Sequence, residues 1–430
     1  MSNDKLAILV AGGPAPGINS VIGAATIRAC LSGVEVLGIQ EGFKWIMQGD
    51  TTHVTPLTIT ETSRIHFRGG STLGTSRANP TKKPEHLKQT LAALDALGVG
   101  KLITIGGDDT AFSAFSLAKE SNGALRVVHV PKTIDNDLDL PLETPTFGYT
   151  TARSIGVGLV QNLMVDAKTT GRWYFVVAMG RKAGHLALGI GKAAGATVTI
   201  VPEEFARNPR LSVVVDTLAG SIIKRLAYGR PDGVAVMAEG IVEILPEKDL
   251  TGLANVERDE HDHIRISEID FGEIVRNAVR KRLAPFGLKP TIVAKNIGYE
   301  LRCADPVPSD MEYTRDLGYC AARYVIEGGT EALISMVNGH FQPIPFDKIM
   351  DPATHRMRVR MVNLESDRYR IARTYMIRLR RTDLDDELEM ARLAGVIKKS
   401  PDDFKREFSS VYDEDLDPIR SMTDRPPPVA

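Results

Sequence analysis

Three short segments of the sequence combine glycines, carboxylates and a lysine in patterns suited to handling phosphate groups. AGGPAPGIN (residues 11–19) puts glycines between an apolar run and a helix-like stretch, so its backbone could approach an anion. GGDDT (106–110) adds two adjacent carboxylates after a glycine pair, and carboxylates beside phosphate oxygens are typical ligands of Mg²⁺. PKTIDND (131–137) supplies a lysine, a hydroxyl group and two carboxylates, one of which could serve as a general base.

Two of these turns also have a purely structural interpretation. The glycines after the first apolar run could form no more than a tight turn, and an aspartate of GGDDT could cap a helix that starts at Ala111. A cap explains one aspartate and leaves the second without a role. All three segments follow strand-like runs, and three such turns at successive strand ends favour a ligand site over coincidence.

Two downstream segments carry cations suited to phosphate groups. Arg181, in MGRKAG (179–184), follows a glycine at the end of an apolar run, where a guanidinium group can hold a phosphate through two hydrogen bonds. Arg172 lies at the other end of the same predicted strand, so we expect the two arginines to serve the sites of different subunits. GYELR (298–302), downstream of Lys295, groups a tyrosine and an arginine suited to the phosphate of a phosphosugar.

The chain around the first three segments alternates short apolar runs with helix-like stretches. We predict strands at residues 6–10, 34–39, 101–105 and 127–130, and helices at 18–30, 85–97 and 111–119. This alternation predicts a parallel sheet covered by helices on both faces. In such a sheet the carboxyl ends of the strands meet at one edge, where ligands bind.

The alternation restarts near residue 148 and predicts a second α/β unit. Its expected strands are 174–179, 197–201 and 233–238, and its expected helices are 154–167, 184–194 and 211–227. Three other segments are polar or charged: we expect an exposed excursion at 246–265, one charged amphipathic helix at 368–393, and a loosely packed tail over the last ~30 residues.

Composition excludes several classes of protein. Among the 430 residues, 53 lysines and arginines balance 54 aspartates and glutamates, which argues against a nucleic-acid binder. The 43% hydrophobic content argues against a disordered chain. We find no run of about 18 apolar residues and no signal-peptide pattern, so we expect a cytoplasmic protein without a membrane partner. The three cysteines lack metal-binding spacing and suit a reducing compartment.

Taken together, the five motifs at these separations resemble the phosphofructokinase family, in order, over about residues 5–310. RGGSTLGTSR (68–77), which ends in Arg77, resembles a second phosphate-side loop of that family. The resemblance implies two Rossmann-like three-layer α/β domains with a C-terminal helical extension, assembled as a homodimer or homotetramer. The implied domains are residues 1–147 with about 301–350 on the donor side, 148–300 on the sugar-phosphate side, and 351–430 as the extension.

Two positions indicate which phosphoryl donor the resemblance implies. ATP-using members usually carry glycine where this chain has Asp109 and Lys132, and this pair is characteristic of the pyrophosphate-dependent members. Asp109 adds bulk and negative charge where the α-phosphate of a nucleotide would lie. Lys132 adds a cation for pyrophosphate oxygens and for the charge that develops during transfer. Pro14 stands where many ATP-using members carry aspartate.

The resemblance therefore implies a reaction: reversible transfer of a phosphoryl group from pyrophosphate to the 1-hydroxyl of fructose 6-phosphate, a step of glycolysis and gluconeogenesis. The products would be fructose 1,6-bisphosphate and phosphate. Asp135 would be the general base, Asp108 would bind the cofactor Mg²⁺, and Asp137 would support the base. Gly12 and Gly13 would cradle the donor through their backbone N–H groups. The implied catalytic set is completed by Lys132, Asp109, Thr133 and Arg181.

The resemblance also implies a set of sugar-binding residues. Those lining the sugar or taking its hydroxyl groups would be Met179, Gly180, Arg181 and Glu239. Those binding the 6-phosphate would be Tyr299, Arg302 and, from a neighbouring subunit, Arg172. Lys295 would replace a second cross-subunit arginine that has no clear match here, and Tyr299 stands where ATP-using members usually have histidine.

Four alternatives stay open at this point. An ATP-dependent phosphofructokinase with an unusual donor loop shares most of the motifs, as does a pyrophosphate-dependent kinase that prefers another phosphosugar, such as sedoheptulose 7-phosphate. An NAD-kinase-like enzyme shares a GGD turn but leaves PKTIDND and MGR unexplained. A metabolite-sensing module would keep the fold and lose the base, whereas this chain has both Asp135 and Asp108.

Overall fold

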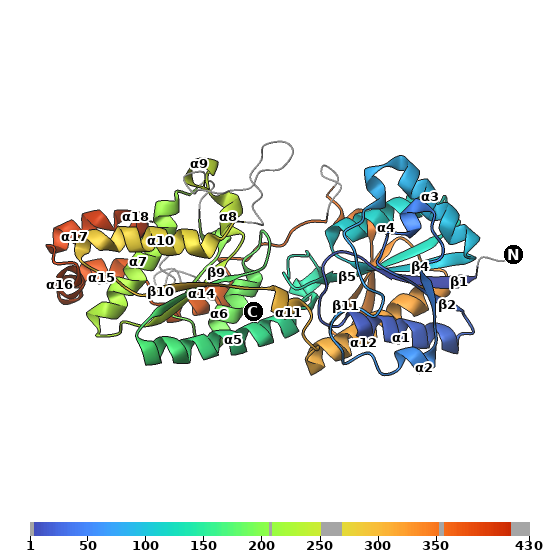
Figure 1. Ribbon diagram of the computed structural model, residues 1–430, viewed down its shortest axis with the longest axis horizontal. Helices are drawn as coiled ribbons and strands as arrows, with labels where there is room; N and C mark the ends of the chain where they lie inside the picture. Colours follow the sequence, from blue (N-terminus) through green and yellow to red (C-terminus); the bar gives the residue numbers. More distant parts are fainter. Residues whose placement is uncertain (1–3, 206–208, 251–268, 352–356, 414–430) are drawn as a thin grey trace, which may run out of the picture. The chain divides into compact units, whose positions relative to one another are not determined.

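The structure, a computed structural model, describes residues 4–205, 209–250, 269–351 and 357–413. The chain forms two compact units (Figure 1): unit 1 comprises Met1–Ile155 and Tyr299–Arg360, and unit 2 comprises Gly156–Gly298 and Met361–Ala430. Each unit has its own sheet covered by helices, so the predicted α/β architecture with a helical C-terminal part is confirmed. The domain boundaries given above stay a prediction.

Unit 1 is built on a sheet with the strand order β12-β11-β5-β4-β1-β2-β3. Its strands are β1 (Lys5–Val10), β2 (Val36–Ile39), β3 (Val54–Leu57), β4 (Val99–Gly106), β5 (Arg126–Thr133), β11 (Ala332–Val337) and β12 (His340–Pro345), with the short β6 (Phe147–Gly148) beside β5. The inner strands are parallel, and their apolar runs are buried because helices cover both faces. The four predicted strands, β1, β2, β4 and β5, pair in parallel as expected, whereas the edge strands β3 and β12, which were not predicted, run antiparallel.

A tight hairpin explains the β12 edge. The two residues between β11 and β12 are Asn338 and Gly339, and both have positive φ (50° and 78°). Two positive φ angles are what a type I′ turn requires, and Asn-Gly is the dipeptide that adopts them most readily. The signal for this antiparallel pair was therefore present in the sequence.

Helices flank the sheet of unit 1 on both sides (Figure 1). They are α1 (Ile18–Leu31), α2 (Ile59–Thr62), α3 (Pro84–Ala96), α4 (Asp108–Glu120), α11 (Tyr299–Arg302), α12 (Pro308–Ile326) and α13 (Phe346–Ile349), with 3₁₀ turns at Ile46–Gln48, Pro80–Lys82 and Pro141–Glu143. α3 and α4 lie on one side, and α1 and α12 on the other. α1 and α12 approach so closely that a Cβ at Gly318 would stand 2.4 Å from the carbonyl oxygen of Val21.

Unit 2 is built on a parallel sheet with the strand order β10-β7-β9-β8. Its strands are β7 (Trp173–Ala178), β8 (Val198–Ile200), β9 (Gly233–Ala238) and β10 (Ile292–Ile297). Its helices up to β10 are α5 (Tyr149–Thr170, which begins in unit 1), α6 (His185–Ala194), α7 (Leu211–Ala227), α8 (Ile241–Ile244), α9 (Glu247–Leu250) and α10 (Phe271–Leu283), with 3₁₀ turns at Pro202–Glu204 and Ala284–Phe286. The sequence did not predict β10, because Lys295 and Asn296 interrupt its apolar run.

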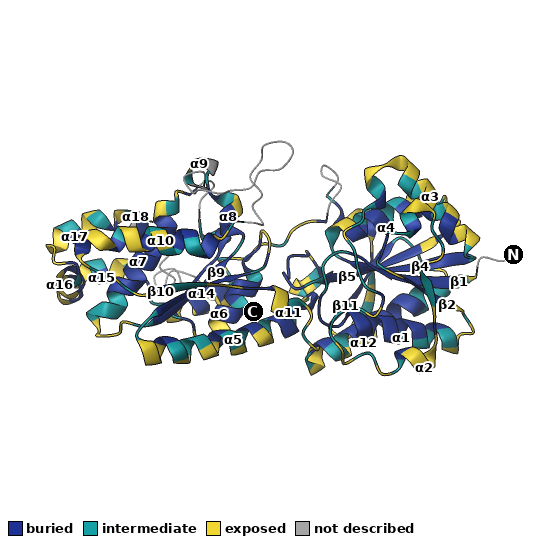
Figure 2. Cartoon of the chain, in the orientation of Figure 1, coloured by how far each residue is buried: buried dark blue, intermediate teal, exposed yellow. Residues whose placement is uncertain are grey.

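The C-terminal helices pack onto unit 2 and share its core. They are α14 (Asp367–Tyr375), α15 (Arg381–Asp385), α16 (Glu387–Val396), α17 (Pro401–Glu407) and α18 (Ser409–Asp413). Leu379, Leu393 and Phe404 are fully buried in the same cluster as residues of α7 and α10. Figure 2 shows this pattern as alternating buried and exposed faces on the helices.

The prediction of one helix over 368–393 is wrong. The chain leaves the helical conformation after Tyr375, and the Ile377 N–H donates instead to the Thr197 carbonyl oxygen at 2.8 Å. A second break falls at Asp386, whose side chain caps α16 by accepting the N–H groups of Leu388 and Glu389. The charged amphipathic pattern was real, but a long-range backbone bond and a cap divide it into three helices.

Two predicted segments fall largely outside the described residues. Of the expected excursion at 246–265, the structure describes the part up to residue 250, and of the expected tail it describes residues up to 413. Within the parts of the chain that the structure covers, we find no helix of the length and apolarity needed to span a membrane.

Candidate active site

The turn after β1 lies against a lysine from β5. Gly12 has a φ of 84°, a left-handed conformation that favours glycine, and a Cβ built there would stand 3.9 Å from Lys132 Nζ. Lys132 is 4% exposed, and its Nζ donates a hydrogen bond to the Gly13 carbonyl oxygen. The structure therefore brings together Gly12, Gly13 and Lys132, which the sequence places about 120 residues apart.

The N–H of Gly12 is already used within the protein. It donates to the Ser76 carbonyl oxygen at 2.8 Å, while Thr75 Oγ1 donates to the Gly12 carbonyl oxygen at 2.7 Å. The Gly12 N–H is therefore engaged within the protein in this conformation, and the cradling of a phosphate by this group stays a prediction. Both partners belong to the loop at 68–77, which resembles a phosphate-side loop. This loop therefore lies beside the turn after β1.

Asn19, in the first turn of α1, holds that loop in place. Its Nδ2 donates to the carbonyl oxygens of Arg68 and Gly69, and its Oδ1 accepts the Thr72 N–H at 2.8 Å. Asn19 is itself buried. The predicted Arg77 lies at the end of the same loop with its side chain exposed.

Arg302 also lies against the turn after β1. A Cβ at Gly13 would stand 2.8 Å from Arg302 Nη1, and the guanidinium carbon lies 4.6 Å from the centre of the Tyr299 ring. The Nε atom of Arg302 is buried with no hydrogen-bond partner among the described residues. Within unit 1, the donor-side turn thus has two cations beside it, Lys132 and Arg302, whereas Tyr299 is exposed.

The two adjacent aspartates form the first turn of α4. The N-cap of α4 is Gly107, so Asp108 is already inside the helix and the interpretation of a capping aspartate is wrong. Both carboxylates lie near the positive end of the helix dipole, which attracts negative charge. Asp108 Oδ1 accepts the Met357 N–H at 2.7 Å, and Asp109 is exposed.

A buried histidine supports the turn before these aspartates, and the sequence analysis did not single it out. His129 in β5 is fully buried, with Nε2 3.1 Å from the Gly106 carbonyl oxygen and Nδ1 2.8 Å from Thr104 Oγ1. A carbonyl oxygen only accepts, so Nε2 carries the proton and Nδ1 accepts from the threonine. Burial is the main reason that the pKa of His129 falls to about 3, so this imidazole is neutral.

The turn after β5 holds the predicted base. Asp135 and Asp137 are 7% and 8% exposed. The Oγ1 of Thr133 accepts the Asp135 N–H at 3.0 Å and donates to Asp137 Oδ1 at 3.3 Å. Asn136, between the two aspartates, has a φ of 56°, which is uncommon for a residue other than glycine. One threonine therefore fixes the geometry of both carboxylate-bearing residues.

In unit 2 the MGR turn is held by a glutamate from the next strand. Glu239 Oε1 accepts the N–H groups of Gly180 (3.0 Å) and Arg181 (2.7 Å). Arg181 has a φ of 50°, and a Cβ at Gly240 would stand 2.2 Å from the Arg181 carbonyl oxygen. The expected sugar-binding residues Gly180, Arg181 and Glu239 are thus gathered in one place, with one oxygen of Glu239 engaged by the backbone. Met179 packs against Gly298.

A second glutamate supports the far end of the same turn. Glu203 Oε1 accepts the Gly184 N–H and the Val362 N–H, each at 2.9 Å. Burial raises the pKa of this carboxyl group, and the two backbone N–H groups oppose that shift. Glu203 was not among the predicted site residues, because nothing in its local sequence marks it.

Arg172 and Lys295 do not join the MGR turn. Arg172 precedes β7 and Arg181 follows it, so they lie at opposite ends of one strand. Lys295 is exposed on the edge strand β10. The expectation that Arg172 and Arg181 of one chain cannot share a site agrees with this arrangement.

The acidic groups of unit 1 suit a metal that shares its coordination with a substrate. Across the described ranges, no group of three or more histidine, cysteine, aspartate or glutamate residues could enclose a metal ion by itself. Mg²⁺ typically takes one or two carboxylates and completes its shell with phosphate oxygens and water. Asp108, with Asp109 beside it at the start of α4, fits that requirement.

Comparison with known proteins identifies similar sequences over nearly the whole chain. The family described as "Phosphofructokinase" matches residues 5–325. A protein of Thermotoga maritima named pyrophosphate–fructose 6-phosphate 1-phosphotransferase is 50% identical over 410 residues, which is 94% of this chain and 98% of that protein. A protein of Naegleria fowleri with the same name is 49% identical over 413 residues, or 94% of each chain. The predicted resemblance is confirmed.

Solved structures agree on the fold. The crystal structure titled as a pyrophosphate-dependent phosphofructokinase from Nitrosospira multiformis aligns with a TM-score of 0.64 at 16% identity. The alignment covers 92% of each chain. At that identity the likeness shows the fold alone.

Proposed function

Because this chain belongs to the phosphofructokinase family, we propose that it transfers a phosphoryl group reversibly from pyrophosphate to the 1-hydroxyl of fructose 6-phosphate. The products are fructose 1,6-bisphosphate and phosphate. Two relatives at about half identity are named for this reaction, and each aligns with 94% of this chain. One observation supports the choice of pyrophosphate as the donor. Lys132 stands at a position where ATP-using members usually have glycine, and this lysine is buried and contacts the turn after β1.

The charges in unit 1 support pyrophosphate over a nucleotide. Lys132 lies against Gly13, so it provides a cation for the oxygens of a compact, highly charged anion. Asp109 projects from the start of α4 with its carboxylate exposed, and it repels a further phosphate that would extend toward it. A nucleotide carries that further phosphate, whereas pyrophosphate does not.

The chemistry of the acceptor follows from the turn after β5. Asp135 takes the proton from the 1-hydroxyl as that oxygen attacks phosphorus, and phosphate leaves as the P–O bond of pyrophosphate breaks. Thr133 and Asp137 keep Asp135 in position, and Lys132 stabilises the charge that develops on the transferred group. Asp108 holds Mg²⁺, which supplies neutralisation of the pyrophosphate charge.

Unit 2 supplies the sugar side of the proposal. Met179, Gly180 and Arg181 line the sugar, and the second carboxylate oxygen of Glu239 takes its hydroxyl groups, since Oε1 is bonded to the backbone. Tyr299 and Arg302, which belong to unit 1, bind the 6-phosphate together with Arg172 of a neighbouring subunit in a homo-oligomer. Lys295 is the proposed second cross-subunit cation.

A donor-exchange assay tests this function. The purified protein with Mg²⁺ and fructose 6-phosphate is expected to turn over with pyrophosphate and to show almost no turnover with ATP. Robust turnover with ATP would instead support the ATP-dependent alternative. Comparing kcat/KM for fructose 6-phosphate and sedoheptulose 7-phosphate separates the proposed acceptor from the other phosphosugar.

A double substitution tests the donor argument directly. Asp109→Gly with Lys132→Gly should admit ATP, because it removes both the repelling carboxylate and the bulk that exclude a nucleotide. Lys119→Gly with Glu120→Gly is a matched control, since it removes the same two charges from the exposed far end of α4. If ATP stays excluded in the first variant, donor choice resides elsewhere.

A further inference from the structure

Four residues near the end of unit 1 connect the two turns that carry its site carboxylates. In the 357–360 segment, the Met357 N–H donates to Asp108 Oδ1 at 2.7 Å. Val359 forms an antiparallel bridge with Leu138. The Arg360 N–H donates to the Asp137 carbonyl oxygen at 2.7 Å. A single stretch of backbone therefore fixes the start of α4 relative to the turn after β5.

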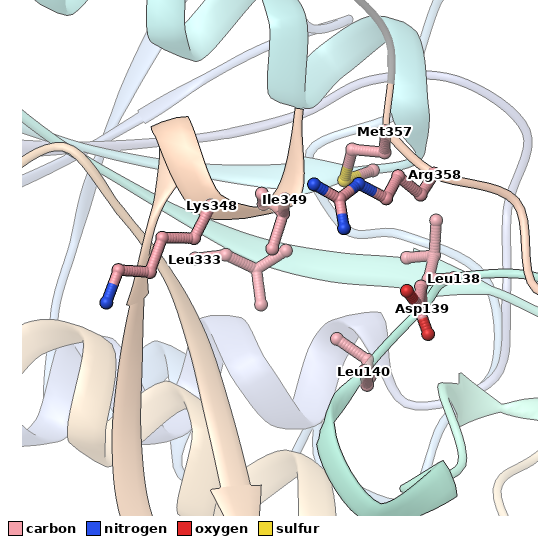
Figure 3. Close-up of a pocket in the computed structure, with 8 residues that line it drawn as sticks. All are labelled: Leu138, Asp139, Leu140, Leu333, Lys348, Ile349, Met357 and Arg358. Atoms are coloured by element: carbon pink, nitrogen blue, oxygen red, sulfur yellow. The ribbon is translucent and has the colours of Figure 1, made fainter. Parts of the chain in front are cut away.

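Figure 3 shows part of this arrangement around a small pocket of unit 1. Met357 and Arg358 of the segment lie beside Leu138 and Asp139, which continue the turn after β5. The Asp139 N–H approaches the Arg358 carbonyl oxygen at 3.4 Å, which adds a backbone contact between the two segments. The pocket is too small for a phosphosugar, and we interpret its lining as packing between the segment and the turn.

The side chain of Arg360 adds a second layer of contacts. Its Nη2 donates to Asn136 Oδ1 at 2.7 Å and to the Asn136 carbonyl oxygen at 3.1 Å. Its Nη1 donates to the Thr144 carbonyl oxygen at 3.3 Å. Asn136 Oδ1 also accepts the Thr146 N–H at 3.1 Å, so Arg360 and Thr146 hold the same side chain. Apart from the bond to Thr144, these bonds converge on Asn136, the residue between Asp135 and Asp137.

This convergence matters because Asn136 is in an unfavourable backbone conformation. A φ of 56° costs free energy in a residue other than glycine, and it persists only when the surroundings fix it. Neither Asp135 nor Asp137 can keep its direction if Asn136 relaxes, because both are its covalent neighbours. Arg360 is the long-range group that holds Asn136 from outside the turn.

Arginine suits this position for two physical reasons. Its planar guanidinium group presents several donors in a fixed fork, and here the donors reach acceptors on two separate residues, Asn136 and Thr144. Burial lowers the pKa of Arg360, while Glu143, Asp139 and Asp137 oppose that shift, and a guanidinium group stays charged at neutral pH. A lysine would keep the charge and lose the fork.

We propose that Arg360 is a positioning residue for Asp135, acting through Asn136, and that the 357–360 segment orients the Asp108 and Asp135 turns together. The proposal rests on the proposed function for its kinetic consequences. The segment lies beyond residues 5–325, the part matched by the family, so that match does not account for it. Arg360 need not touch substrate to affect turnover, because a small displacement of the general base steeply reduces the rate of the reaction that it catalyses.

The test compares Arg360→Met with Arg360→Lys and with a matched control, Arg358→Met. Arg358 lies in the same segment with its side chain exposed, and it contributes only its backbone to the contacts described. With pyrophosphate and fructose 6-phosphate, Arg360→Met is expected to lower kcat about 100-fold, while both KM values stay within about threefold. Arg360→Lys should retain intermediate activity, and Arg358→Met should match the parent.

Hydrogen exchange provides a readout that does not depend on activity. In Arg360→Met, amide exchange in peptides covering 134–146 should become faster, with the rest of unit 1 unchanged. The reason is that Arg360 no longer holds the Asn136 side chain, which accepts the Thr146 N–H. Arg358→Met should leave this exchange unchanged. If the parent protein shows no pyrophosphate-dependent turnover, the proposed function fails, and the exchange experiment still decides the role of Arg360.

Three outcomes would overturn the proposal. One is a normal kcat in Arg360→Met. Another is a lower melting temperature with unchanged kcat per folded molecule, which would make the role purely structural. The third is unchanged exchange over 134–146. Should Arg360→Met fail to fold, Arg360→Lys carries the test, and parental kcat and exchange in that variant would count against the proposal.

Discussion

At the scale of single residues, the turn after β5 holds two buried aspartates in place through one threonine. Thr133 Oγ1 accepts the backbone N–H of Asp135 and donates its own proton to Asp137 Oδ1. One hydroxyl group therefore links the backbone of the first aspartate to the side chain of the second. This contact supports the proposed roles of Asp135 as the base and of Asp137 as the residue that keeps it in position.

The assignment of the base predicts a large kinetic effect from a small chemical change. Asp135→Asn keeps the shape of the side chain but cannot accept the hydroxyl proton, so kcat should fall by roughly 10² to 10⁴. Steady-state kinetics with pyrophosphate measures this fall, and circular dichroism checks the fold. Asp139→Asn, four residues along and exposed, is the control and should be near normal. A near-parental kcat in Asp135→Asn would remove it as the base.

At this scale, sequence and structure agree where the signal is local and differ where it is not. Short motifs at the ends of strands contain Gly12, Asp108, Lys132 and Asp135, so the types and spacing of these residues could be interpreted without coordinates. Arg360 has no such motif, and its partners lie more than 200 residues earlier in the chain. Only the fold makes that contact.

At the scale of elements, β4 and β5 end in the two acidic turns, and a buried histidine joins them. The His129 imidazole in β5 bonds to the last carbonyl of β4, Gly106, directly before the start of α4. Thr104 of β4 bonds to its other nitrogen. Burial keeps this ring neutral, so a neutral imidazole links the two strand ends.

The burial of a neutral His129 predicts that the folded protein loses stability as the pH falls. The pKa of His129 is lowered to about 3 in the folded protein, below the ordinary value of 6.5 that the unfolded chain would have. Its contribution to stability is therefore complete above pH 6.5 and is lost as the pH falls toward 3, at up to about 1.4 kcal/mol per pH unit. Unfolding measured between pH 7.5 and pH 4.5 should show this loss.

His129→Gln separates this effect from other titrations. The variant should be less stable at pH 7.5 and should show a shallower decline in stability on acidification than the parent. His340→Gln, which removes an exposed histidine from β12, is the control and should follow the parental curve. Parallel curves for the parent and His129→Gln would mean that His129 does not titrate as described.

The elements also show why hydrophobic pattern alone predicts some boundaries and not others. α7 and β9 run as predicted, from residue 211 to 227 and from 233 to 238, because their patterns are uninterrupted. β10 was missed because two adjacent exposed polar residues, Lys295 and Asn296, interrupt the apolar run of this edge strand. The single helix expected at 368–393 was divided by a bond to Thr197, a partner that no local pattern can reveal.

At the scale of the whole molecule, the positions of the arginines in unit 2 bear on assembly. Arg172 and Arg181 lie at opposite ends of β7, yet both are proposed to act on the phosphates of one reaction. One chain cannot bring both to one site through this strand. The proposed function therefore requires Arg172 from a second copy of the chain, and we expect a homo-oligomer.

Mixed oligomers test that requirement. Arg172→Met and Asp135→Asn should each be poorly active alone, the first through a raised KM for fructose 6-phosphate. When the two variants are co-expressed, some sites would combine an intact Asp135 with an intact Arg172 from the neighbour, so activity should exceed that of either variant. Activity equal to the average of the separate variants would contradict sharing between subunits.

The pairing of β5 with β11 also has a consequence for how the protein is made. β11 pairs with β5 in the sheet, but Ala332 follows Thr133 by about 200 residues. The first part of unit 2, Gly156–Gly298, is synthesised between these two strands. At about 5–20 residues per second, a ribosome leaves that edge of β5 without its neighbour for roughly 10–40 seconds. An open strand edge is a template for association with other chains. The segment from β11 to Arg360 is therefore the last part of unit 1 to emerge, and we expect the nascent chain to depend on chaperones until it does.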